Sequence, residues 1–183
     1  MEAIQSFDFT ILNAIQDSLR CAFLDGFAVF LSYITTSGII WIAIAVILLF
    51  FRKTRAAGIL LLGALALSFL TSELLLKLLI QRPRPFVVNP NITLLITPPT
   101  GTSFPSSHSC LAAASATVLL VKKRWLGVIA LIMTLCIAFS RLYLYFHFPS
   151  DVLCGLLLGV ICALIMLWIG KITHLDNRLS KKS

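Results

Sequence analysis

The stretch Ser140-Arg-Leu-Tyr-Leu-Tyr-Phe-His-Phe-Pro-Ser-Asp151 places an arginine, a histidine and an aspartate between two long apolar runs. Charged side chains are costly at membrane depth unless they are paired or hydrated, so their presence there indicates a functional site. His147 and Asp151 are four residues apart, and on a helical turn the carboxylate can hold one ring nitrogen. The other nitrogen is then free as a nucleophile or base, and Arg141 offers a charged fork that suits a phosphate. The alternative is a plain helix end, with Arg141 reaching to the interface and His147 acting as a cap.

The composition around this stretch excludes an ordinary soluble domain. Of the 183 residues, 59% are hydrophobic and 12% are charged, and the mean hydropathy is +1.00. These values indicate an integral membrane protein with a single domain. The net charge of +8 falls in short clusters beside apolar runs, which is typical of topology signals and lipid head-group contacts. Because no soluble basic face is visible, a nucleic-acid partner is not expected.

The five cysteines mostly lie inside apolar runs or at their ends and show no C-x-x-C spacing. Neither a disulfide framework nor a zinc site is therefore expected, and small packing side chains are the better interpretation. No cleavable signal peptide is expected either, because residues 1–20 are amphipathic and carry acidic side chains.

Residues 1–20 predict an amphipathic helix lying on the membrane surface, with an unstructured tail as the alternative. The apolar positions at helical spacing are Ile4, Phe7, Ile11, Ile15 and Leu19. Residues 21–172 are predicted to form the membrane domain, and residues 173–183 a polar cytoplasmic tail.

The expected fold is an all-α bundle of six transmembrane helices. Residues 21–51 are long for one span and short for two, and the polar break at 35–38 favours two helices. If they form a single span instead, the N-terminus moves to the outside and the site keeps its place. The remaining spans are predicted at 57–80, 108–121, 125–143 and 151–170.

Positive charge predicts the orientation. Most of the 15 lysines and arginines cluster at one set of span ends: Arg20, Arg52, Lys53, Arg55, Lys122, Lys123, Arg124, Lys171, Arg178, Lys181 and Lys182. By the positive-inside rule these residues and both termini are cytoplasmic in the plasma membrane. The exceptions are Lys77, Arg82, Arg84 and Arg141, which are expected on the extracytoplasmic face together with His108 and His147.

The third span ends in Lys77-Leu-Leu-Ile-Gln-Arg-Pro-Arg84-Pro85. The prolines should end the helix and turn Arg84 back toward the site, where it and Lys77 suit a multiply charged anion. The alternative is that the cations of this segment reach into the interface, and for Arg82 this interpretation is preferred. Glu73 lies four residues before Lys77, in the favourable order for an ion pair that orients the lysine.

The fourth span is preceded by Phe104-Pro-Ser-Ser-His108. Serines at a helix N-terminus cap it and leave backbone N–H groups that bind phosphate oxygens, which makes Ser106 and Ser107 candidates for substrate binding. His108 can donate a proton to a leaving group, or it can be a simple capping histidine.

In order, these stretches are Lys-x6-Arg-Pro, Pro-Ser-x-His and Ser-Arg-x5-His-x3-Asp. The chain resembles the type 2 phosphatidic acid phosphatase family, whose fold and active site are shared with vanadium-dependent haloperoxidases. There is one departure, because Ser107 stands where the family usually has glycine. A serine keeps the N–H, but it would be strained in a left-handed or very close backbone geometry.

The resemblance implies that His147 attacks phosphorus and forms a phosphohistidine, with Asp151 holding and charge-stabilising its ring. His108 would protonate the leaving oxygen and then activate water. The phosphoryl oxygens would be held by Lys77, Arg84, Arg141, Ser106 and Ser107.

No metal or other cofactor is expected, because Asp151 and Glu73 are the only acids expected near this face and form no carboxylate cluster for magnesium. The expected substrate is a membrane lipid phosphate or diphosphate, either undecaprenyl diphosphate or phosphatidylglycerophosphate. A phosphatidate or lipid A phosphatase is an alternative. A different class of function is a non-catalytic lipid-binding or transport scaffold, against which the completeness of the motifs argues.

Overall fold

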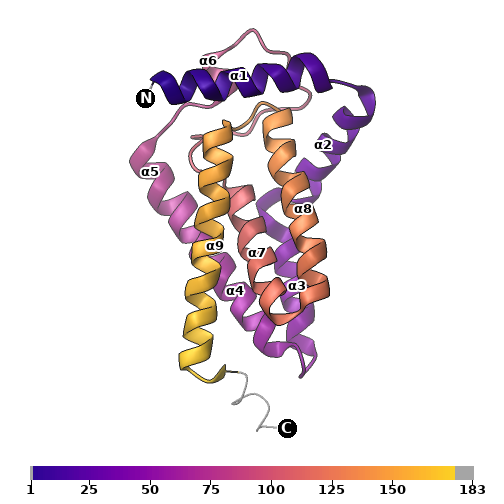
Figure 1. The fold of residues 1–183 in the computed structure, drawn as a ribbon, viewed down its shortest axis with the longest axis vertical. Helices are drawn as coiled ribbons and strands as arrows, with labels where there is room; N and C mark the ends of the chain where they lie inside the picture. Colours follow the sequence, from indigo (N-terminus) through magenta and orange to yellow (C-terminus); the bar gives the residue numbers. More distant parts are fainter. Residues whose placement is uncertain (1, 176–183) are drawn as a thin grey trace.

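The structure is a computed structural model that describes residues 2–175, and within them the chain is helical without strands (Figure 1). An N-terminal helix, α1 (Glu2–Leu19), lies across one end of a bundle formed by the other long helices. The following elements are α2 (Ala22–Ile34), a 3-10 turn η1 (Thr36–Gly38), α3 (Ile39–Phe50), α4 (Arg55–Phe69), a π-helical segment η2 (Leu70–Leu76), α5 (Lys77–Ile80), α6 (Pro85–Val88), α7 (Ser107–Lys122), α8 (Arg124–Tyr143) and α9 (Pro149–Ile172).

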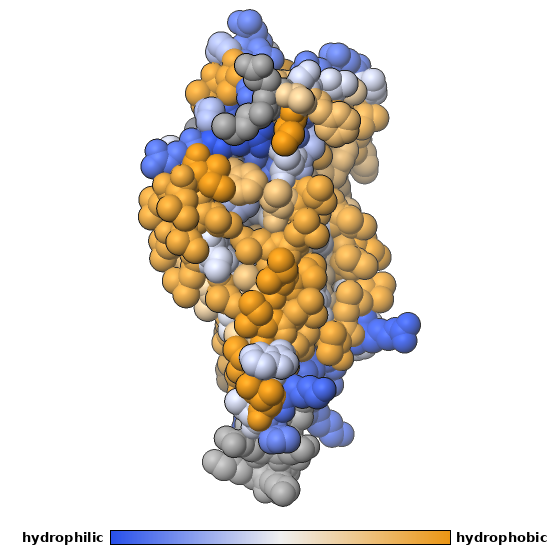
Figure 2. All heavy atoms as spheres, turned by 60° about the vertical axis from the view of Figure 1, so that its left-hand side comes forward, coloured by the Kyte–Doolittle hydropathy of each residue, from blue (hydrophilic) through white to orange (hydrophobic). Residues whose placement is uncertain are grey.

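The surface of the bundle is that of a multi-pass membrane protein. Three helical stretches of the described chain are long and apolar enough to cross a bilayer: Arg55–Val88, Arg124–Tyr143 and Pro149–Ile172. Hydrophobic side chains cover the middle of the face in Figure 2, and hydrophilic residues gather toward both ends. α7 is apolar but has 16 residues, so it rises about 24 Å at 1.5 Å per residue, less than the 30 Å of a hydrocarbon core.

The structure does not support two separate spans within residues 21–51. α2 and α3 have 13 and 12 residues, so each rises only about 20 Å. They meet at η1 with a bend of 53°, and together they can form one bent span. The prediction of six spans is therefore not confirmed. Hydropathy finds the polar break at 35–38 but cannot distinguish a bend within one span from a loop between two.

α1 lies at the end of the bundle that holds the loop between α6 and α7, and α9 ends at the opposite end (Figure 1). Arg20, just after α1, donates to the carbonyl of Thr93 in that loop at 3.4 Å. The expectation that Arg20 lies with the other basic clusters, and that both termini share one side, is therefore wrong. α1 lies at the site end of the bundle, as the alternative of a single span over residues 21–51 requires. Part of the predicted tail, residues 176–183, lies outside the described residues.

α7 is the central helix, and α9 packs so closely on it that the two backbones touch. A Cβ added at Gly159 would lie 2.1 Å from the carbonyl oxygen of Cys110, and one at Gly155 would lie 2.5 Å from that of Ser106. Small residues four apart allow this approach between membrane helices. The contact places the N-terminal ends of α7 and α9 side by side, which is where the motif residues lie.

We predict that Gly159→Ala destabilises the fold, because its Cβ would overlap the backbone of α7. Overpacking of this kind costs about 1–3 kcal/mol, which should lower the Tm in detergent. The matched control is Gly26→Ala in α2, where an added Cβ meets nothing within 4 Å. If both variants melt at the wild-type temperature, the backbone contact between α7 and α9 is not as close as described.

Candidate active site

A cavity of about 520 Å³ opens at the α1 end of the bundle, among α2, η2, α7 and the ends of α5 and α8. Most of the predicted site residues line it: Lys77, Arg84, Ser107, His108, Arg141 and His147. These side chains come from three stretches far apart in the sequence, and the fold brings them to one place. Ser106 and Asp151 do not line the cavity and lie behind it.

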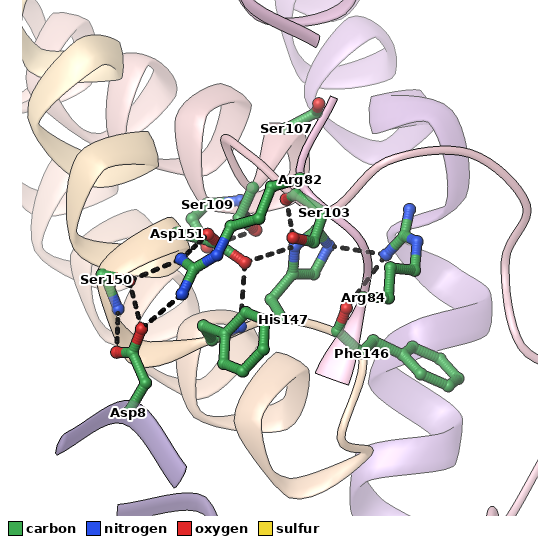
Figure 3. Close-up of polar contacts among 12 residues, drawn as sticks. Asp8, Arg82, Arg84, Ser103, Ser107, Ser109, Phe146, His147, Ser150 and Asp151 are labelled. Atoms are coloured by element: carbon green, nitrogen blue, oxygen red, sulfur yellow. Dashed lines mark hydrogen bonds and ion pairs between the residues drawn. The ribbon is translucent and has the colours of Figure 1, made fainter. Parts of the chain in front are cut away.

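His147 is held in one tautomer. Its Nδ1 lies 2.7 Å from the carbonyl oxygen of Ser103, and a carbonyl only accepts, so Nδ1 carries the hydrogen (Figure 3). Nε2 is then the nitrogen with a lone pair, and Nη1 of Arg84 donates to it across 3.2 Å. Burial, and after it the nearby charge of Arg84, holds the pKa of His147 well below its ordinary value of 6.5. A low pKa favours the neutral imidazole, and the lone pair of Nε2 faces Arg84.

Arg84 reaches the site as the prolines predict. α5 ends at Ile80, and Arg84 is 4% exposed. Besides the contact with His147, its guanidinium donates to the carbonyl of Gly101 at 3.0 Å and to that of Phe146 at 3.1 Å. Arg84 is thus held by backbone oxygens and contacts Nε2 of His147, with no carboxylate partner among these contacts.

The other two cations of the cavity have different partners. Lys77 pairs with Glu73 at 2.7 Å, as the spacing predicts. Glu73 also accepts a hydrogen bond from the hydroxyl of Ser107, a link that the sequence did not indicate. Arg141 is 2% exposed, and its Nε and Nη2 donate to the hydroxyl of Ser140 at 3.2 and 3.1 Å.

The N-terminus of α7 uses its two serines differently. Ser106 is fully buried, and its hydroxyl lies 2.9 Å from that of Ser109 and caps the helix. The hydroxyl of Ser106 therefore does not face the cavity, and its backbone N–H donates to the carbonyl of Asp151 at 3.1 Å. Ser107 is the first residue of α7 and is absent from the residues with positive φ, so the glycine position is not left-handed in this chain.

Asp151 does not hold the ring of His147 by a direct hydrogen bond. Its Oδ2 lies 4.0 Å from Nδ1, beyond hydrogen-bond range, and accepts from the N–H of Phe148 at 2.9 Å. The prediction from the four-residue spacing is wrong because α9 begins at Pro149. His147 therefore precedes the helix and does not share a helical turn with Asp151. Ser103, which sequence reasoning missed, makes the hydrogen bond expected of Asp151.

Arg82 does not reach into the interface, and the preferred interpretation of it is wrong. Its guanidinium pairs with Asp151 at 2.6 Å and with Asp8 of α1 at 2.8 Å (Figure 3). The expectation that Asp151 and Glu73 are the only acids near the site is wrong for the same reason. The sequence does contain a signal that Asp8 faces the protein interior, because helical spacing places it on one face with the apolar Leu12 and Ile15. In the structure all three side chains are buried. Within residues 2–175, no three His, Cys, Asp or Glu side chains converge in a metal-binding arrangement.

The same architecture occurs in proteins of known structure. LpxE from Aquifex aeolicus superposes with a TM-score of 0.75 at 29% identity, covering 87% of this chain and 93% of that one. A PAP2-type phosphatidylglycerolphosphate phosphatase from Bacillus subtilis superposes with a TM-score of 0.76 at 28% identity, covering 93% and 88%.

In sequence, the chain is 36% identical over 143 residues to an undecaprenyl-diphosphatase from Sulfolobus acidocaldarius, covering 76% of this chain and 68% of that protein. The model of the PAP2 superfamily matches residues 56–173, a range that contains the three motifs from Lys77 to Asp151. The chain therefore belongs to the PAP2 superfamily.

Proposed function

We propose that this chain hydrolyses a lipid phosphate or diphosphate in its cavity through a phosphohistidine at His147. Membership of the superfamily makes it an integral membrane lipid phosphatase, a phosphoric ester hydrolase. The observation that carries the assignment of the nucleophile is the tautomer of His147. Its Nδ1–H is bonded to a carbonyl, and Nε2 lies 3.2 Å from a guanidinium in a cavity lined by two further cations.

In the first step, Nε2 of His147 attacks phosphorus, the bond to the leaving oxygen breaks, and His108 gives that oxygen a proton. In the second step, His108 takes a proton from water, the water oxygen attacks phosphorus, and the P–N bond breaks. Lys77, Arg84 and Arg141 hold the phosphoryl oxygens, aided by the N–H of Ser107 at the start of α7. Phosphoryl transfer depends mainly on positioning and charge stabilisation, so these cations can take the place of a metal ion.

The lipid part of the substrate can contact apolar side chains of the cavity lining, which include Tyr33, Phe69 and Leu111. Undecaprenyl diphosphate and phosphatidylglycerophosphate are the preferred substrates, and the names of the archaeal relative and of the Bacillus structure support this choice. Phosphatidate and a lipid A phosphate are the alternatives.

We further propose that the site faces the extracytoplasmic side of the plasma membrane, with α1 at that interface. Basic residues lie at the opposite end of the bundle, in clusters at 52–55 and 122–124 and at Lys171 in the last turn of α9. The positive-inside rule makes that end cytoplasmic. The exposed apolar side chains of α1, Ile4 and Phe7, suit a helix lying at the membrane surface.

The first prediction is that phosphate release by the purified protein survives EDTA and is lost in His147→Ala, because the histidine is the nucleophile and no metal takes part. The assay compares undecaprenyl diphosphate, phosphatidylglycerophosphate and phosphatidate in detergent, and the ratio of kcat/KM values identifies the substrate class. Loss of activity in EDTA would refute the metal-free mechanism. No release from any lipid would favour the scaffold function.

The second prediction concerns the serine at the usual glycine position. Ser107→Gly should change kcat/KM by less than about tenfold, because the hydroxyl bonds Glu73 and a single hydrogen bond contributes about 0.5–1.5 kcal/mol. His108→Ala, the adjacent substitution, should lower kcat by at least about a hundredfold as a lost general acid. Equal losses in the two variants would mean that the hydroxyl of Ser107 acts on the substrate directly.

A further inference from the structure

Arg82 joins the N-terminal helix to the residues behind the nucleophile. Its Nη1 donates to Asp151 at 2.6 Å and to the hydroxyl of Ser150 at 2.7 Å, and its Nη2 donates to Asp8 at 2.8 Å (Figure 3). Asp8 is 1% exposed and Asp151 is fully buried. A carboxylate is not buried to this extent without strong pairing, so all three charges depend on one another.

An aromatic ring covers one face of the guanidinium. The Cζ of Arg82 lies 3.9 Å from the centroid of the Phe148 ring, and Phe9 of α1 packs edge-on against the same ring at 5.2 Å. The Phe148 ring covers one face of the guanidinium and helps to hold its orientation, and the burial of both carboxylates strengthens the ion pairs.

α1 also supports the loop that carries His147 and the first turn of α9. Asp8 accepts from the N–H of Ser150 at 2.9 Å, and Asn13 accepts from the hydroxyl of Tyr145 at 2.9 Å. Tyr145 has a φ of 60°, a conformation that is strained for a residue other than glycine and persists only where its surroundings hold it. α1 supplies part of those surroundings, although it lies outside residues 56–173, the part of the chain that the family model matches.

The charges of this cluster do not cancel. Asp8 and Asp151 flank the single cation of Arg82, which leaves one negative charge, and a carboxylate oxygen of Asp151 lies 4.0 Å from Nδ1 of His147. A ring that bonds phosphorus through Nε2 while keeping its proton on Nδ1 becomes positive. The excess negative charge beside Nδ1 stabilises that form.

We propose that Asp8 and Arg82 are positioning residues for the nucleophile, and that α1 is thereby a working part of the active site. Arg82 fixes Asp151 behind the imidazole, and Asp8 offsets the charge of Arg82 so that Asp151 still acts as an anion toward His147. This proposal rests on the proposed function, in which His147 is the nucleophile.

The test begins with Asp8→Asn, which keeps the shape of the side chain and removes its negative charge. The charges of Arg82 and Asp151 then cancel. We expect kcat to fall about ten- to a hundredfold, the usual effect of removing a residue that supports a reactive group, with KM nearly unchanged. Asp17→Asn is the matched control, because it removes the same charge from an exposed position of α1. It should leave kcat at the wild-type value.

The double variant Asp8→Asn with Arg82→Gln separates electrostatic positioning from simple support of the fold. It restores one net negative charge beside His147, so its kcat should exceed that of Asp8→Asn alone. Arg82→Lys, which keeps the charge, should retain more activity than Arg82→Gln. A double variant less active than either single variant, with its Tm lowered in parallel, would overturn the proposal, and so would an Asp8→Asn variant with wild-type kcat.

A second readout does not need turnover. The ¹⁵N resonances of the His147 ring, identified by their absence in His147→Asn, should shift in Asp8→Asn and stay in place in Asp17→Asn. Unchanged resonances in Asp8→Asn would overturn the proposal. A wild-type protein that releases no phosphate would instead overturn the proposed function, and the ring resonances would still decide whether Asp8 acts on His147.

Discussion

The arrangement of the site depends on one hydrogen bond, from Nδ1 of His147 to the carbonyl of Ser103 at 2.7 Å. That carbonyl is itself fixed, because the N–H of Ser103 donates to the carbonyl of Arg82 at 2.8 Å and its hydroxyl to that of Pro83 at 3.1 Å. Arg84 follows directly and touches the opposite nitrogen of the ring. One short segment between α5 and α6 therefore orients the imidazole from both sides and carries Arg82 toward α1 and Asp151.

The segment between α5 and α6 can orient His147 only because α7 and α9 are held in a fixed position relative to each other. The glycines of α9 let its backbone touch α7, and the N–H of Ser106 then reaches the carbonyl of Asp151 across the two helix starts. Membrane helices gain little from the hydrophobic effect against lipid, so close packing of this kind and buried polar contacts determine their relative positions. Stability of the bundle and geometry of the site are linked through this one contact.

The sequence predicted the helical class, the residues that gather at the cavity and the Glu73–Lys77 pair, because each depends on local spacing or on the cost of charge in a membrane. It could not predict that Ser103 would replace Asp151 at Nδ1, because that depends on where α9 begins. The helical face that Asp8 shares with Leu12 and Ile15 indicates that Asp8 is buried, but no local spacing identifies Arg82, 74 residues away, as its partner. The bend at η1 was not predicted, because hydropathy carries no information on the direction of a helix axis.

The distribution of charge explains why this cavity should prefer an anion with more than one charge. Lys77 is neutralised by Glu73, and Arg82 by Asp8 and Asp151. Within residues 2–175, Arg84 and Arg141 form no salt bridge and are held by carbonyl and hydroxyl oxygens. Two buried cations without counter-ions are costly. A phosphate dianion between them would offset that cost, which is an electrostatic reason for the proposed binding of a phosphoryl group beside His147.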